Sequence, residues 1–162
     1  MFGAIGDSAL DRWGRVITRR AERRRAEREG TAPPRLREID YLLMVDDEAR
    51  QGALRFAERK GGSFLAELGP TKIPPLIELP RLLSAAEHVP GSTDSDEDLR
   101  LLLAPGSSLG GARPKATLRD RDWQLAIAKF PNKGDEINIV LWKAVALILA
   151  TKSGDCGSRM AP

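Results

Sequence analysis

The hydrophobic period of the chain changes at Pro105, and this change constrains the fold more than any other feature. Before Pro105, apolar residues recur at the spacing of amphipathic helices. After it, Lys115 to Arg119 can form a strand, a turn follows at Asp120 to Asp122, and Trp123 to Phe130 alternates as a returning strand does. The sequence therefore predicts an α+β fold, in which a mainly helical part is followed by an antiparallel hairpin and one more helix.

The first predicted helix has two halves of different character. Asp7 and Ser8 can cap it, and an apolar face that includes Trp13 and Ile17 is expected to pack on a core. The second half, Arg19 to Glu29, consists almost entirely of Arg and Glu. We expect this half to be a solvated charged face, and the alternative is a stripe that binds phosphates or a partner.

Three further helices are predicted before Pro105, at about 36–43, 78–89 and 95–104. Their inward-facing residues are expected to be Leu36, Ile39, Leu42, Leu43, Leu79, Leu82, Leu83, Leu99, Leu102 and Leu103. Carboxylates that complement the helix dipole open the third of these helices, at Asp94, Asp96, Glu97 and Asp98. Asp46, Asp47 and Glu48 predict a polar loop or a cap, because adjacent carboxylates do not converge on one metal ion.

The last predicted helix, capped from Asp135, is apolar around most of its circumference from Ile139 to Ala150. Such a helix needs neighbours that cover it. Lys143 interrupts the apolar run, and the run is shorter than the ~20 residues of a membrane-spanning helix, so no transmembrane segment is predicted. The tail from Thr151 to Pro162 is rich in Gly and Ser and is expected to be disordered.

Composition excludes several classes of protein. The net charge of +3 is a small surplus of 26 basic over 23 acidic residues, which gives only weak support to nucleic-acid binding. The chain has one cysteine, Cys156, and one histidine, His88, so neither a Cys/His zinc site nor a catalytic triad is predicted. No signal-peptide pattern opens the sequence, and we expect a cytoplasmic protein.

A glycine-rich loop, a strand with a lysine and a following helix together suit the binding of ATP phosphates. Gly110 and Gly111 allow backbone N–H groups to approach phosphate oxygens closely. Lys115 lies at the exit of the loop and Lys129 lies in the second strand, where an ammonium group can neutralise phosphate charge. Taken alone, a Gly-Gly turn and a solvated lysine explain the same residues.

Five segments, which occur in the same order as in the HipA family, resemble those toxin/antitoxin serine/threonine kinases over about residues 2–150. They are Asp11-Arg12-Trp13-Gly14-Arg15, Asp40-Tyr41-Leu42-Leu43, Asp46 to Phe56, Ser108-Leu109-Gly110-Gly111-Ala112-Arg113-Pro114-Lys115 and Ile127-Ala128-Lys129-Phe130-Pro131. The resemblance implies a helical N-terminal subdomain at 1–104 and the core of a kinase N-lobe at 105–150, and the tail at 151–162, expected to be disordered from its composition, lies beyond it.

The resemblance also assigns roles to individual residues. It implies a nucleotide-binding set formed by Gly110, Gly111, Ala112, Arg113, Lys115 and Lys129. Ser108 matches the family's regulatory phosphorylation serine. Lys143 stands where relatives usually carry a glutamate that could pair with the strand lysine.

The resemblance further implies a toxin kinase that phosphorylates a protein of translation and binds a HipB-like antitoxin, and through it DNA. The catalytic Asp and the residues that hold Mg²⁺ belong to the larger kinase lobe, so no catalytic or metal-binding residue is assigned here. We expect a sequence truncated at both ends, with weak ATP binding and no turnover by itself. The alternative is a non-catalytic module that docks on an antitoxin or on a separately encoded kinase C-lobe.

Overall fold

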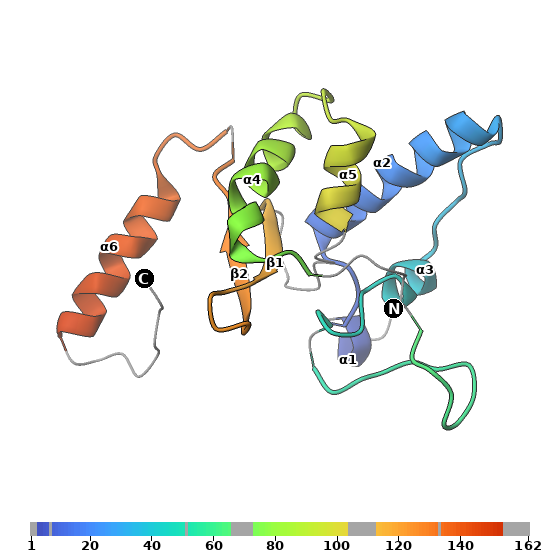
Figure 1. Cartoon of the computed structure of the whole chain (residues 1–162), viewed down its shortest axis with the longest axis horizontal. Helices are drawn as coiled ribbons and strands as arrows, with labels where there is room; N and C mark the ends of the chain where they lie inside the picture. Colours follow the sequence, from blue (N-terminus) through green and yellow to red (C-terminus); the bar gives the residue numbers. More distant parts are fainter. Residues whose placement is uncertain are drawn as a thin grey trace.

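The computed structural model describes residues 3–6, 8–50, 52–65, 73–103, 113–132 and 134–153 and has the predicted α+β architecture. In chain order its elements are α1 (Gly3–Gly6), α2 (Arg12–Glu29), α3 (Glu38–Leu43), the short 3-10 helix η1 (Leu76–Glu78), α4 (Leu79–His88), α5 (Asp96–Leu103), β1 (Lys115–Arg119), β2 (Leu125–Lys129) and α6 (Ile139–Lys152). Figure 1 shows α2, α4 and α5 grouped beside the hairpin, while α6 stands apart from them.

The main core joins the helical part to the hairpin. Its buried members are Trp13, Ile17, Leu82, Ala85, Ala86, Val89, Leu99, Leu102, Ala116 and Phe130. These residues come from α2, α4 and the residue after it, α5, β1 and the residue after β2, so the core crosses the predicted boundary at 104/105. A smaller cluster of Leu10, Tyr41 and Val45 lies beside α3.

The predicted antiparallel hairpin is present, and in its register Lys115 pairs with Lys129 and Arg119 with Leu125. Asp120 forms its turn, because its side chain accepts hydrogen bonds from the backbone N–H groups of Asp122 and Gln124, both at 2.9 Å. Trp123 closes the turn in the left-handed region with φ 59°. The predicted face of Leu125, Ile127 and Lys129 is exposed, while Ala126 and Ala128 alternate with it.

Two predicted helix caps were wrong. Asp11 caps α2, since its carboxylate accepts a hydrogen bond from the backbone N–H of Gly14 at 2.7 Å; Ser8 instead lies buried in a turn, and Asp7 lies outside the described residues. Asn138, directly before α6, caps it by accepting from the N–H of Leu141 at 2.9 Å, and the carboxylate of Asp135 is bound to Arg113 instead.

Most of the residues that were predicted to face inward are buried or half-buried, and two of them, Ile39 and Leu103, are exposed. Leu82, Leu99 and Leu102 are buried. Ile39 is 46 % exposed, because α3 turns Tyr41 and Leu42 inward instead. Leu103, at the end of α5, is also exposed. Asp46 has the predicted loop role, since its side chain accepts from the N–H groups of Glu48 and Ala49.

Candidate nucleotide site

Only part of the predicted nucleotide-binding set can be placed. Ser108, Gly110, Gly111 and Ala112 lie outside the described residues. Arg113, Lys115 and Lys129 lie within them, and each has a different environment.

Lys115 is buried at the start of β1 and forms an ion pair with Asp11 of the α2 cap. The side chains of the two residues are 3 % and 2 % exposed, although they are far apart in the sequence. A charge that is removed from water needs such a partner, because burial of an unpaired ion is strongly unfavourable. The ammonium group of Lys115 is therefore engaged inside the protein.

Lys129 is the direct cross-strand partner of Lys115 and is exposed at the end of β2. Directly opposed residues of an antiparallel pair have Cβ atoms about 5 Å apart, on the same face of the hairpin. Among the described residues, Lys129 has no ion pair, in contrast to Lys115. The structure thus places a solvated lysine beside the residue that ends the glycine-rich segment.

Arg113 forms two parallel hydrogen bonds with the carboxylate of Asp135, at 2.7 and 2.8 Å. Asp135 also accepts from the backbone N–H of Asn132 at 3.1 Å. Arg113 and this N–H group lower the pKa of Asp135 below its ordinary value. The pair ties the start of the hairpin to the segment that leads into α6, so the guanidinium of Arg113 is also occupied.

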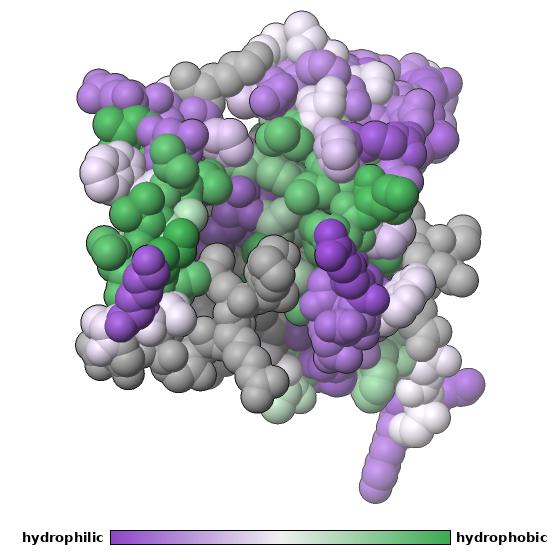
Figure 2. All heavy atoms as spheres, turned by 60° about the vertical axis from the view of Figure 1, so that its left-hand side comes forward, coloured by the Kyte–Doolittle hydropathy of each residue, from purple (hydrophilic) through white to green (hydrophobic). Residues whose placement is uncertain are grey.

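Helix α6 carries the largest exposed apolar surface among the described residues. None of its side chains is buried, and Trp142 and Leu149 are 63 % and 61 % exposed. Figure 2 shows the side of the molecule on which α6 stands, and large apolar areas lie open on it. Trp123, Leu125 and Ile127 of the hairpin are exposed as well. Lys143 is exposed on α6.

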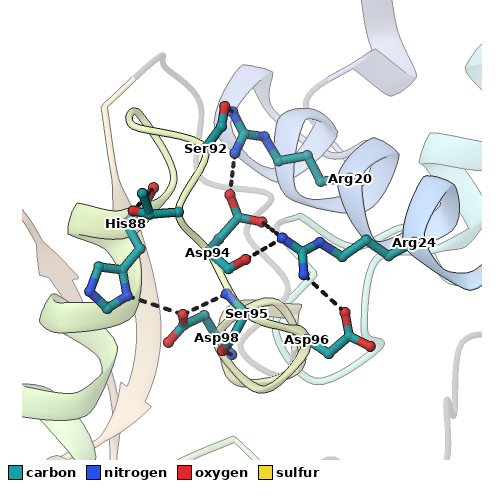
Figure 3. Close-up of polar contacts among 9 residues, drawn as sticks. Arg20, Arg24, His88, Ser92, Asp94, Ser95, Asp96 and Asp98 are labelled. Atoms are coloured by element: carbon teal, nitrogen blue, oxygen red, sulfur yellow. Dashed lines mark hydrogen bonds and ion pairs between the residues drawn. The ribbon is translucent and has the colours of Figure 1, made fainter.

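The charged half of α2 is less solvated than the sequence predicts. Arg20, Arg24 and Arg28 recur every four residues along one face of α2 and reach across to the start of α5, as Figure 3 shows for the first two. Asp94, whose side chain is 2 % exposed, pairs with Arg20 and Arg24, and Asp96 pairs with Arg24 at 3.2 Å and with Arg28 at 2.8 Å.

These residues line an open cavity of about 510 Å³ together with Arg23 and Glu27. The two aspartates neutralise much of the positive charge of the cavity, which weakens the hypothesis of a phosphate-binding stripe on α2. Arg23 has no ion pair within the described part of the chain.

The residues that cap the start of α5 also contact the end of α4, as Figure 3 shows. Asp98 accepts from the backbone N–H of Ser95 at 2.8 Å, and the hydroxyl of Ser95 accepts from the N–H of Asp98 at 3.0 Å. His88 Nδ1 lies 3.1 Å from the same Asp98 carboxylate. The Ser95 N–H and His88 lower the pKa of Asp98. His88 thus stands at a helix C-terminus, as the sequence predicts.

Asp11 is the residue of this region that sequence reasoning missed. It belongs to the Asp-Arg-Trp-Gly-Arg segment that carries the resemblance, and that segment was the available signal. Spacing along the chain gave no sign of its pairing with Lys115, because the two residues come from separate elements.

Comparisons of the chain with family models, with curated proteins and with solved structures find no match. In the described ranges, no helix is long and apolar enough to cross a membrane. The same ranges contain no group of three or more His, Cys, Asp or Glu side chains placed to hold a metal ion.

Proposed function

We propose that this chain is the phosphate-contacting part of a HipA-like serine/threonine kinase and binds ATP through the glycine-rich segment 106–115 and Lys129. One observation carries the proposal: the register of the hairpin sets exposed Lys129 directly opposite the residue at which that segment ends. In protein kinases, a lysine on the second strand after a glycine-rich loop helps to neutralise the ATP phosphates, and Lys129 lies on the second strand after the segment 106–115.

Lys129 supplies a solvated cation, which suits the phosphates of ATP. Adenine sits between two lobes in a kinase, and the Mg²⁺ ligands come from the larger one. We therefore expect weak ATP binding and no phosphoryl transfer by this chain alone.

Calorimetric titration with ATP tests the proposal. Lys129→Ala removes the phosphate contact and is expected to weaken binding by about tenfold, equivalent to ~1.4 kcal/mol. Lys152→Ala is the matched control, because Lys152 is an exposed lysine at the far end of α6. Equal affinities of wild type and Lys129→Ala would contradict the phosphate contact.

A second candidate function, that of an interaction module, is favoured by α6. Exposed apolar patches of this kind mark surfaces that bind other proteins. The kinase C-lobe is the expected partner, because in the related kinases the N-lobe packs on it. A HipB-like antitoxin is the alternative partner.

Co-expression with a kinase C-lobe or with a HipB-like antitoxin tests this candidate. Leu141→Glu and Leu149→Glu place charges on exposed apolar positions of α6 and are expected to abolish copurification without unfolding the chain. Glu136→Lys, which changes an exposed charge before α6, is the control. Copurification that survives both α6 variants would contradict the assignment.

A further inference from the structure

Five large apolar side chains form one exposed side of α6, the helix that stands apart from the others in Figure 1. They are Leu141, Trp142, Val145, Ile148 and Leu149. Their spacing along the helix places them within about 120° of its circumference. Their exposed fractions range from 38 % to 63 %. Lys143 lies on the opposite side of α6, so the apolar side is free of charge along its centre.

The two ends of α6 carry opposite charges. Glu136 lies just before the helix and Lys152 is its last residue, and both are exposed. Within the described ranges neither forms an ion pair, whereas the neighbouring Asp135 is bound to Arg113. Two such helices that lie side by side in the same direction bring like charges together. In opposite directions, Glu136 of each comes close to Lys152 of the other, and the helix dipoles also attract.

We propose that α6 pairs with α6 of a second copy of this chain in an antiparallel arrangement with twofold symmetry. The apolar side of one helix packs on the same side of the other, and the contact between Glu136 and Lys152 occurs twice, as the symmetry requires. The inference does not depend on ATP binding. It uses the surface that the second candidate function assigns to a kinase C-lobe, so the two associations exclude each other.

The apolar area of this surface suits a weak dimer. At their exposed fractions, the five side chains leave about 600 Å² open on each copy, less than the ~800 Å² that each partner of a standard interface buries. Interfaces at this end of the size range hold transient complexes. We therefore expect a reversible equilibrium between monomer and dimer with a dissociation constant in the micromolar range. Unfolding measured at lower protein concentration then reports on the monomer alone.

Sedimentation equilibrium of the full chain over a range of concentrations tests the pairing. Leu141→Glu places a charge in the apolar contact of both copies and is expected to raise the dissociation constant by about a hundredfold or more. Lys143→Glu is the matched control, because it changes a charge on the opposite side of the same helix. A change of less than about threefold is expected for the control.

The charges at the two ends of α6 test the direction of the pairing. Glu136→Lys turns two attractive contacts into repulsive ones and is expected to weaken the dimer by about tenfold. Glu136→Lys/Lys152→Glu exchanges the two charges and is expected to restore the dissociation constant of the wild type. In a parallel pair, like charges would still face each other after the exchange, so nothing would be restored.

Three outcomes would overturn the proposal. A wild-type chain that stays monomeric at every concentration would exclude the dimer, and a dimer that Leu141→Glu leaves intact would place the contact away from α6. A dimer that Glu136→Lys weakens but the exchanged pair does not restore would exclude the antiparallel arrangement. The charge exchange decides the matter even if Leu141→Glu does not fold, because both of its positions are exposed.

Discussion

Lys115 and Lys129 stand directly opposite each other in the hairpin, yet one is buried in an ion pair with Asp11 and the other is exposed. Two like charges at opposed positions would repel each other if both were left in the same environment. The carboxylate of Asp11 compensates one of them inside the protein. The hairpin thus combines a structural lysine and a solvent-facing lysine at the end where the glycine-rich segment joins it.

A row of three arginines on α2, formed by Arg20, Arg24 and Arg28, is expected to stabilise the helical part of the fold. Arg24→Ala removes ion pairs with Asp94 and Asp96 and leaves the buried carboxylate of Asp94 with one fewer partner. We expect a loss of ~1–3 kcal/mol in the free energy of unfolding, measured by urea denaturation. Arg23→Ala is the control, and a change within about 0.5 kcal/mol is expected for it. Equal effects of the two variants would show that the row adds no stability.

Asp98 is expected to make the stability depend on pH. Its pKa in the folded protein is lowered, so its stabilising contribution is complete above the unfolded value of about 3.9 and is lost as the pH falls through the folded pKa. Asp98→Asn does not titrate and should be less stable than wild type by ~1 kcal/mol at pH 7. Urea denaturation from pH 7 to pH 3 should show this difference shrinking below about pH 4. A constant difference would exclude the charge of Asp98 as its cause.

Arg113 is expected to control the titration of Asp135. Arg113→Ala removes the largest cause of the lowered pKa, so the pKa of Asp135 should rise toward its ordinary value. Carboxyl NMR titration of the two proteins measures this change. Arg119→Ala is the matched control, because Arg119 pairs with Glu48 instead. An unchanged Asp135 titration in Arg113→Ala would show that the two residues do not pair in solution.

Replacing a leucine of α4 by alanine is expected to lower the free energy of unfolding far more than replacing a leucine of α6. Leu82→Ala opens a cavity in the main core, where Leu82 is fully buried, and should cost ~2–5 kcal/mol. Leu149→Ala changes an exposed side chain and should stay within about 0.5 kcal/mol. Urea denaturation measures both. A large loss from Leu149→Ala would mean that α6 packs on the rest of the chain.

Local patterns in the sequence predicted much of the fold. The apolar spacing predicted α4 and α5, and the alternation with its turn at Asp120 predicted the antiparallel hairpin. The cap of α2 was not predictable in the same way, because Asp7, Ser8 and Asp11 can all cap a helix. The choice of Asp11 goes together with its burial against Lys115, which is a contact between distant parts of the chain.

The candidate site shows the same division between local and long-range information. Sequence spacing predicted that Lys129 lies mid-strand on a face shared with Leu125 and Ile127. The shared face is confirmed, but Lys129 is the last residue of β2. Spacing did not separate Lys115 from Lys129, because both are lysines in strands. Only packing distinguishes them. The same is true of Arg20 and Arg24, whose partners Asp94 and Asp96 lie at the start of α5, far away in the sequence.

In the proposed site Lys129, and not Lys115, contacts the phosphates of ATP. NMR spectra of the lysine side-chain ammonium groups, recorded while ATP is added, can distinguish the two lysines. We predict that the Lys129 signal shifts in proportion to bound ATP while the Lys115 signal stays in place. A shift of Lys115 with an unmoved Lys129 would contradict the account.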